Sequence, residues 1–412
     1  MNIQLKIENI LNYVINNSAY YQRLFKSNSI DISKIKTIED LHQIPFTTKD
    51  DLARFNDMFL CVPKTKIIDY VTTSGTFGSP VSFYLTENDL ERLASNEEAS
   101  FKLVGANSSD IFQMMVTLDK QFMAGLAYYL GIRKLKAGAV RQGPGSPANQ
   151  IETILKFDTT VLIAIPSFIV KLIEYAKTKN IDLNQTSVKT IICIGESIRD
   201  EDLNFNVLGK RITSNWNVSL HSTYASTEMG AAFTECKAGN GGHLNPELLI
   251  LEVVNNKGEI VKDGELGEVV VTTLGIEGMP LIRYKTGDLC NVYYSECSCG
   301  LTSPRLGPVI GRKQQLIKYK GTTIFPPSIF EVLTQLNIDL FQVNVYKNDL
   351  GLDNVSIKLP STIDDENLIK NLKSALKAKL RVTPTLELID KKELIGLVFN
   401  PEKRKPIKIV FH

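Results

Sequence analysis

The chain has 412 residues, of which 43% are hydrophobic and 22% are charged. This composition is ordinary for a globular protein with a sizeable core, and the length predicts about two or three domains. The formal net charge is only +2. Because binding to nucleic acid or to a membrane surface usually requires a strong positive field, we expect neither partner. We expect no signal peptide and no bilayer span. The six cysteines are expected to be reduced, in the cytoplasm.

The first half of the chain alternates predicted helices with predicted strands. Apolar residues recur at helical spacing from Ile3 to Val14 and over residues 87–104. Further on, short apolar runs predict strands at 111–116, 138–140, 161–165 and 188–194. Helices are expected between them at 123–130, 150–157 and 166–178. This order predicts a layered α/β domain with largely parallel strands, whose ligands lie at the carboxyl ends of the strands.

The second half has a different sequence pattern. Runs at 249–254, 267–273 and 282–284, separated by glycine turns, predict a β-rich subdomain built as an antiparallel sheet or barrel. After Gly311, strands at 341–346, 355–359 and 386–389 and a helix at 366–380 predict a small α+β domain. We therefore expect an α/β protein with two domains, 1–311 and 312–412.

One loop carries many hydroxyl groups. Residues 72–80 read Thr-Thr-Ser-Gly-Thr-Phe-Gly-Ser-Pro, between predicted strands at 67–71 and 81–85. Glycines allow backbone N–H groups to turn inward and form a nest for an anion, and hydroxyls add donors to phosphate oxygens. The residues expected to hold a polyphosphate are Thr73, Ser74, Gly75, Thr76 and Gly78. A plain turn remains the alternative, because such clusters are mostly loops and no GxxxxGK[ST] pattern is present.

Further stretches follow the loop along the chain. They read Ile-Gly-Glu-Ser at 194–197, Ser-Thr-Tyr-Ala-Ser-Thr-Glu at 222–228, Tyr-Lys-Thr-Gly-Asp at 284–288, Gly-Arg-Lys-Gln-Gln-Leu-Ile at 311–317 and Lys-Arg-Lys-Pro-Ile-Lys at 403–408. Each alone also fits an ordinary turn, linker or solvated tail. Together and in this order, the stretches resemble the motifs of adenylate-forming ligases, specifically the phenylacetate–CoA ligase branch. The resemblance covers nearly the whole chain and implies a large adenylation domain followed by a small mobile C-terminal domain.

The resemblance implies a role for each matching residue. The turn at Gly195, Glu196 and Ser197 would line the adenine pocket, with the first two backbone amides reading the adenine edge, and Tyr224 would stack on the base. Asp288 would accept both ribose hydroxyls, and Arg312 would contact phosphate or ribose. The implied catalytic residues are Thr227 on a phosphate oxygen, Glu228 as the Mg²⁺ ligand and Lys405 at the α-phosphate, with Gln314 as the hinge.

The implied reaction joins a carboxylate, ATP and coenzyme A. The carboxylate would form an acyl adenylate with release of pyrophosphate, and coenzyme A would then take the acyl group. By resemblance the acid is aromatic or arylalkyl, with Phe122 and Ala225 in its pocket. Departures from the family motifs at Phe77, Gln314, Gln315 and Arg404 keep two alternatives open. One is transfer to an acyl-carrier protein or an amine, and the other is a non-catalytic nucleotide-binding regulator. A homodimer is also possible.

Four residues form a candidate zinc site. They are Cys236, His243, Cys297 and Cys299, and three thiolates with one imidazole make a common structural zinc shell. The C-x-C spacing is a weaker signal than C-x-x-C, so four ordinary reduced residues are the alternative. Cys290 is a spare thiol that can substitute for one ligand.

Overall fold

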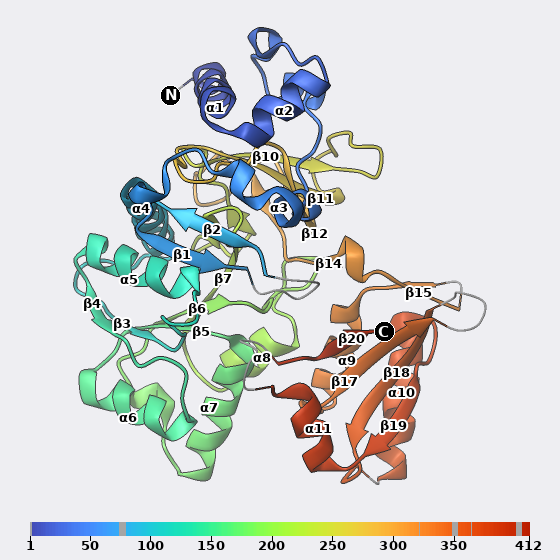
Figure 1. Cartoon of the computed structure of the whole chain (residues 1–412). Coiled ribbons are helices and arrows are strands. Elements are labelled where there is room, and N and C mark those ends of the chain that lie inside the picture. Colours follow the sequence, from blue (N-terminus) through green and yellow to red (C-terminus); the bar gives the residue numbers. More distant parts are fainter. Residues whose placement is uncertain (1, 74–79, 321, 348–352, 364, 401–405) are drawn as a thin grey trace. The chain divides into compact units, whose positions relative to one another are not determined.

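The computed structural model describes residues 2–73, 80–320, 322–347, 353–363, 365–400 and 406–412 (Figure 1). The chain divides into two compact units, Met1–Val309 and Ile310–His412, called here the first and second unit. The boundary expected from the sequence, after residue 311, lies two residues further along the chain. Over the residues described, no helix combines the length and apolar character that a bilayer crossing requires.

The first unit begins with short helices that pack on its β-rich end. Ile7, Leu11 and Val14 are buried on one face of the first of them. Thr48 and Asp51 form a complete capping box at the start of α3, as their spacing predicts. The bounds are α1 (Ile3–Asn17), α2 (Ala19–Ser27), α3 (Lys49–Phe55) and α4 (Glu87–Leu103). An antiparallel hairpin, β1 (Asp69–Thr72) with β2 (Ser82–Leu85), precedes α4.

The middle of the first unit is the predicted parallel α/β layer. Its strands are β3 (Ile111–Met114), β4 (Gly138–Val140), β5 (Val161–Ala164), β6 (Thr190–Ile194) and β7 (Ser219–Ser226), in the order β7-β6-β5-β3-β4. The helices are α5 (Met123–Leu135), α6 (Pro147–Phe157), α7 (Pro166–Thr178) and α8 (Val207–Thr213). Leu162 and Ile191 face α6 and α7, whereas Ile163 and Ile192 face α4 and α5. Both faces of the strands are therefore buried, which explains their continuous apolar runs.

The β-rich part extends the same sheet instead of closing separately. The strands are β8 (Ala231–Glu235), β9 (Gly242–His243), β10 (Leu249–Val254), β11 (Leu266–Thr273), β12 (Tyr284–Tyr293) and β13 (Arg305–Leu306). They continue antiparallel from β7 in the order β10-β11-β12-β13-β9-β8-β7. The strand expected at 282–284 begins only at Tyr284, because Arg283 has a φ of 48°, which breaks the extended backbone.

The second unit has its own core and its own sheet. Its strands are β14 (Gly311–Arg312), β15 (Ile317–Tyr319), β16 (Thr322–Ile324), β17 (Gln342–Lys347), β18 (Asp353–Pro360), β19 (Thr385–Ile389) and β20 (Ile409–Phe411). Its helices are α9 (Pro326–Gln335), α10 (Glu366–Leu380) and α11 (Lys391–Val398). The sheet order is β19-β18-β17-β20, and Leu372, Leu376 and Leu380 of α10 are buried. This is the small α+β domain that the sequence predicts.

Candidate functional site

Tyr224 and Asp288 meet although 64 residues separate them in the chain. The Tyr224 hydroxyl, on β7, donates a hydrogen bond of 2.9 Å to the Asp288 carboxylate on β12. Asp288 is only 4% exposed, and its backbone N–H donates to Thr286. Burial, reinforced by the Asp288 charge, raises the pKa of Tyr224 well above its ordinary value, so the hydroxyl stays protonated as a donor. The structure thus joins the expected adenine-stacking and ribose-binding residues.

Glu228 follows β7 and has two partners. Its Oε1 accepts a 3.3 Å hydrogen bond from the Tyr284 hydroxyl, and the Lys49 ammonium lies 3.9 Å from the same oxygen. The Glu228 side chain is 12% exposed and the Lys49 side chain 26%. A carboxylate that keeps some exposure and faces a cation suits a polyphosphate with its Mg²⁺, which prefers carboxylate and phosphate oxygens. Lys49 is not among the site residues predicted from the sequence, and its approach to Glu228 makes it a further candidate.

The segment before Lys49 is tied to the start of β12. Thr47 exchanges backbone hydrogen bonds with its neighbours there, donating to Arg283 and accepting from Lys285. The Arg283 guanidinium pairs with Glu252 at 2.7 Å, and both side chains are at most 3% exposed. The Phe46 ring lies 4.1 Å from both the Arg283 guanidinium and the Lys285 ammonium. These contacts hold the segments of Lys49 and Tyr284 together, and both side chains approach Glu228 Oε1.

In the turn after β6, the side chains form hydrogen bonds with other groups of the protein. Gly195 has a φ of 74°, a conformation that favours glycine. The Glu196 carboxylate accepts two 3.0 Å hydrogen bonds from Ser167, from its N–H and its hydroxyl, at the start of α7. The Ser197 hydroxyl donates to the carbonyl of Arg199. Any ligand contact of this turn is therefore expected from backbone groups, as proposed for the adenine edge.

Of the loop predicted to bind phosphate, the structure describes only the two ends, residues 72–73 and Pro80. Thr73 is buried, its N–H donates to the Val81 carbonyl, and its hydroxyl accepts from the Val81 N–H at 3.0 Å. Four predicted loop residues and the predicted catalytic lysine lie outside the described residues, namely Ser74, Gly75, Thr76, Gly78 and Lys405. Arg312 and Gln314 belong to the second unit, in β14 and in the 3-10 turn Lys313–Gln315.

A small apolar pocket lies beside Thr227 and Glu228. Its other lining residues are Phe83, Tyr84, Leu85, Asp89, Arg92, Leu93, Met123, Gly230, Ile276 and Met279, and its free volume is about 10 Å³. Phe122 and Ala225, the two predicted pocket residues, are not among them. Phe122 is the N-cap of α5 and Ala225 is exposed, whereas Met123 is on the buried face of α5. The helix turn thus points Met123, not Phe122, at this pocket.

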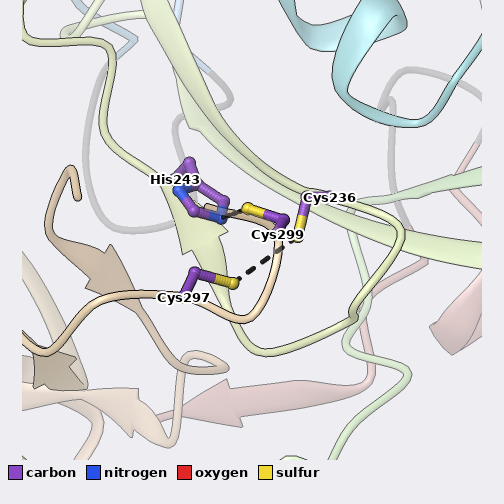
Figure 2. A group of neighbouring side chains, drawn as sticks. All are labelled: Cys236, His243, Cys297 and Cys299. Carbon is purple, nitrogen blue, oxygen red and sulfur yellow. Dashed lines mark hydrogen bonds between the residues drawn. The ribbon is translucent and has the colours of Figure 1, made fainter. Parts of the chain in front are cut away.

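The four predicted metal ligands converge (Figure 2). Their donor atoms all lie within 4.8 Å of one another. The sulfur atoms of Cys236 and Cys297 are 3.8 Å apart, and the Cys299 sulfur is 3.6 Å from His243 Nε2. Tetrahedral zinc with Zn–S bonds of about 2.3 Å and a Zn–N bond of about 2.0 Å requires separations of about 3.8 and 3.5 Å. The donor set and these two distances therefore fit zinc.

Surrounding groups orient these ligands. The second ring nitrogen of His243 lies 3.1 Å from the Ser303 hydroxyl, and the N–H of Ala238 donates to the Cys236 sulfur. Gly300, with a φ of 87°, closes a tight turn in which its N–H donates to the Cys297 carbonyl. A hydrogen bond to the free imidazole nitrogen is a usual feature of zinc-binding histidines. Cys290, the proposed substitute thiol, is not in this cluster.

Comparisons with known proteins agree on the family. The sequence pattern of the family described as AMP-binding enzyme matches residues 38–277. A phenylacetate–coenzyme A ligase of Thermus thermophilus is 27% identical over 361 residues, which is 86% of this chain and 79% of that protein. Protein CapK of Staphylococcus aureus is 23% identical over 385 residues, covering 90% of this chain and 81% of that protein.

Solved structures share the fold. One is a 2-hydroxyisobutyryl-CoA ligase in its postadenylation state with an acyl adenylate, with a TM-score of 0.85 at 18% identity. The alignment covers 100% of this chain and 89% of the chain of that ligase. A benzoate CoA ligase from Burkholderia xenovorans has a TM-score of 0.59 at 15% identity, covering 84% of this chain and 68% of its own. The predicted adenylate-forming fold is confirmed. The chain belongs to the AMP-binding enzyme family, in its phenylacetate–CoA ligase-like branch.

Proposed function

We propose that the chain is an AMP-forming ligase that activates a carboxylate as its acyl adenylate and transfers the acyl group to coenzyme A. The observation that carries the proposal is that two of the predicted nucleotide motifs, 222–228 and 284–288, meet through the Tyr224–Asp288 and Tyr284–Glu228 hydrogen bonds. The curated relatives named phenylacetate–coenzyme A ligases support the same reaction.

The first step needs charge control at the phosphates. The carboxylate oxygen attacks the α-phosphorus of ATP, and the bond to the β-phosphate oxygen breaks to release pyrophosphate. Asp288 accepts the ribose hydroxyls, which orients the nucleotide, while Thr227 binds a phosphate oxygen. Glu228 would hold Mg²⁺, which when bound would supply positive charge next to the phosphates. Lys405 stabilises the charge at the α-phosphate, and one such donor typically contributes a factor of about 10²–10³ in rate.

We propose an aromatic or arylalkyl carboxylate, as in the named relatives. The pocket beside Glu228 supports this, because Phe83, Leu93 and Ile276 give it an apolar lining. Its free volume of about 10 Å³ holds only about one water molecule. A ring therefore enters only when side chains move, and Met123 and Met279 are suited to this because unbranched methionine changes rotamer easily.

The second step follows a swing of the second unit about Gln314, and Arg312 contacts a phosphate or the ribose of the nucleotide. The thiol sulfur of coenzyme A then attacks the acyl carbon, and AMP leaves. The departures at Gln314 and Gln315 leave a carrier-protein thiol or an amine as the alternative acceptor. A comparison of thioester formation with free coenzyme A and with a carrier protein separates these acceptors.

Light scattering tests the homodimer that the sequence analysis left possible.

A structural zinc ion completes the proposal. Cys236, His243, Cys297 and Cys299 would hold it, and the 3.8 and 3.6 Å separations support this. Such a site lends folding energy and takes no part in the chemistry. It needs thiolates, so we place the protein in a reducing compartment, the cytoplasm.

A panel of aromatic, arylalkyl and aliphatic acids tests the activity. Pyrophosphate release is measured with ATP and Mg²⁺, first without and then with coenzyme A, and thioesters are identified by mass. At least one acid should raise pyrophosphate release above the background, and an Asp288→Asn variant should lose this response. If no acid does so, the chain is not an active ligase, and a nucleotide-binding regulator becomes the better account.

A further inference from the structure

The two halves of the nucleotide site are joined through very short strands. Tyr224 is on β7 and Asp288 on β12, and the sheet path between them runs β7-β8-β9-β13-β12. Strands β9 and β13 have two residues each, and each of their pairings in this path has a register of only two residue pairs. So few ladder bonds hold the register weakly, since a short pair of strands is marginal on its own. We call this part of the sheet the seam.

The four metal ligands, shown together in Figure 2, come from different elements of the seam. Cys236 directly follows β8, His243 is within β9, and the other two cysteines, Cys297 and Cys299, lie in the loop between β12 and β13. An ion bound to all four side chains therefore ties β8, β9 and the β12–β13 loop to one point. Apart from such an ion, few described contacts join the β8–β9 loop to the β12–β13 loop. One is the hydrogen bond of 3.2 Å from Asn240 to Ser298.

The charge around the seam also fits a bound ion. Three thiolates with Zn²⁺ and a neutral imidazole carry a net charge of about −1. Arg305, on β13 and paired in register with His243, is 5% exposed and donates to the carbonyls of Asn240 and Ser295. No salt-bridge partner is found for this guanidinium in the part of the chain that the structure describes, and its Nε has no hydrogen-bond acceptor there. An anionic metal–thiolate group beside it supplies the missing counter-charge.

We infer that a zinc ion held by the Cys3His cluster positions the nucleotide site, by fixing the register across the seam and with it the Tyr224–Asp288 hydrogen bond. The inference rests on the proposed nucleotide site. It assigns the metal a role in nucleotide affinity, in addition to local stability. Tyr224 and Asp288 touch the nucleotide in this scheme, whereas the four metal ligands act only through the sheet.

The test compares nucleotide binding in zinc-loaded and zinc-free protein. Zinc is measured by mass spectrometry on the reduced full chain, as purified and after treatment with dipicolinate and gel filtration. Binding of α,β-methylene-ATP with added Mg²⁺ is then measured by calorimetry. We expect stoichiometric zinc as purified, and about a tenfold higher Kd after its removal, which is within the usual range for coupling between two sites. Far-UV circular dichroism should not change, and in turnover KM for ATP should rise more than KM for the carboxylate.

Variants separate the metal from the side chains. His243→Ala should lose zinc and raise the nucleotide Kd, whereas His243→Cys keeps a four-ligand set and should restore both. Cys61→Ser, a buried cysteine outside the cluster, should change neither. Added zinc should lower the Kd of stripped wild-type protein but not that of stripped Tyr224→Phe, which lacks the hydroxyl through which the register acts.

Several results would overturn the inference. They are a nucleotide Kd that does not depend on zinc, purified protein that neither contains nor responds to zinc, and loss of the far-UV signal on stripping, which would mean that the metal holds the whole unit. If no form binds the nucleotide analogue, the proposed function itself fails. That outcome differs from binding that is normal but indifferent to zinc.

Discussion

The buried pair of Arg283 and Glu252 gives the sharpest stability prediction. Glu252→Gln removes the negative charge but keeps the size of the side chain and one carbonyl oxygen. The guanidinium then stays buried, held by the Ile44 carbonyl and the Phe46 ring, with no full counter-charge among these contacts. Breaking one partner of a buried pair typically destabilises a protein by about 3–5 kcal/mol. Because glutamine still accepts a hydrogen bond, we expect about 3 kcal/mol.

That free energy corresponds to a clear shift in melting temperature. The first unit spans Met1–Val309, and a unit of this size loses about 1.5 °C per kcal/mol, so its transition should fall by about 5 °C in calorimetry. The control is Glu174→Gln, which removes the acidic partner of Arg211 from a surface pair whose Glu174 side chain is 52% exposed. Exposed pairs contribute at most about 1 kcal/mol, so this change should be small.

A double variant checks the physical reason. Glu252→Leu with Arg283→Met replaces both charges by apolar groups, and such replacements of a buried pair are often neutral or stabilising. The double variant should therefore recover much of the stability that Glu252→Gln loses. A shift for Glu252→Gln no larger than that of Glu174→Gln would refute the reasoning, because it would show that the guanidinium finds water or another partner.

Three further substitutions test other parts of the first unit and the tail. Tyr224→Phe keeps the ring but removes the donor to Asp288, so the nucleotide Kd should rise about tenfold, as for one lost hydrogen bond to a charged group; equal affinities in calorimetry would contradict this. Lys405→Ala should slow adenylation about 10²–10³-fold while nucleotide binding stays largely intact; an unchanged rate of pyrophosphate exchange would remove Lys405 from the mechanism. Burial raises the pKa of Glu97 from 4.5 to about 7. Wild-type stability should thus fall as the pH rises through this range, because the folded protein keeps a proton that the unfolded chain releases. Glu97→Gln should flatten this part of the melting profile, and equal slopes in the two proteins would refute it.

Local signals in the sequence were enough for most elements. The helix expected at 166–178 has those bounds, since Pro166 starts it and apolar residues recur at helical spacing. The helix at 366–380 is also confirmed, with the Asp365 side chain as its N-cap. Strands β9 and β13 were not predicted, because two residues carry no periodicity. Their pairing is what joins the parallel and antiparallel strands into one sheet, so the sequence predicted two parts where the structure has one continuous path.

The site was predictable by residue type but not by contact. Cys236, His243, Cys297 and Cys299 were singled out by chemistry and spacing, and their convergence is confirmed. The approach of Lys49 to Glu228 depends on the buried contacts of Arg283. The residues around Lys49 do not predict a contact with Glu228, which is far away in the sequence. Phe122 was predicted to line the acid pocket, and the small pocket beside Glu228 is lined by Met123 and not by Phe122. Side-chain direction in a helix changes by about 100° per residue, so two neighbouring residues at a helix start face different surroundings.

These positions also predict how variants divide between binding and rate. The groups proposed to hold the nucleoside, Tyr224 and Asp288, are on paired strands of one sheet. Their arrangement is therefore set by the seam and by the buried contacts around β12, and damage there should appear as weaker nucleotide binding at an intact rate once ATP saturates. Lys405 lies in a separate stretch of the sequence and is proposed to act only when charge develops at the phosphorus, so its loss should lower the rate and spare affinity. A seam variant that lowers the saturated rate without changing ATP affinity would contradict this division.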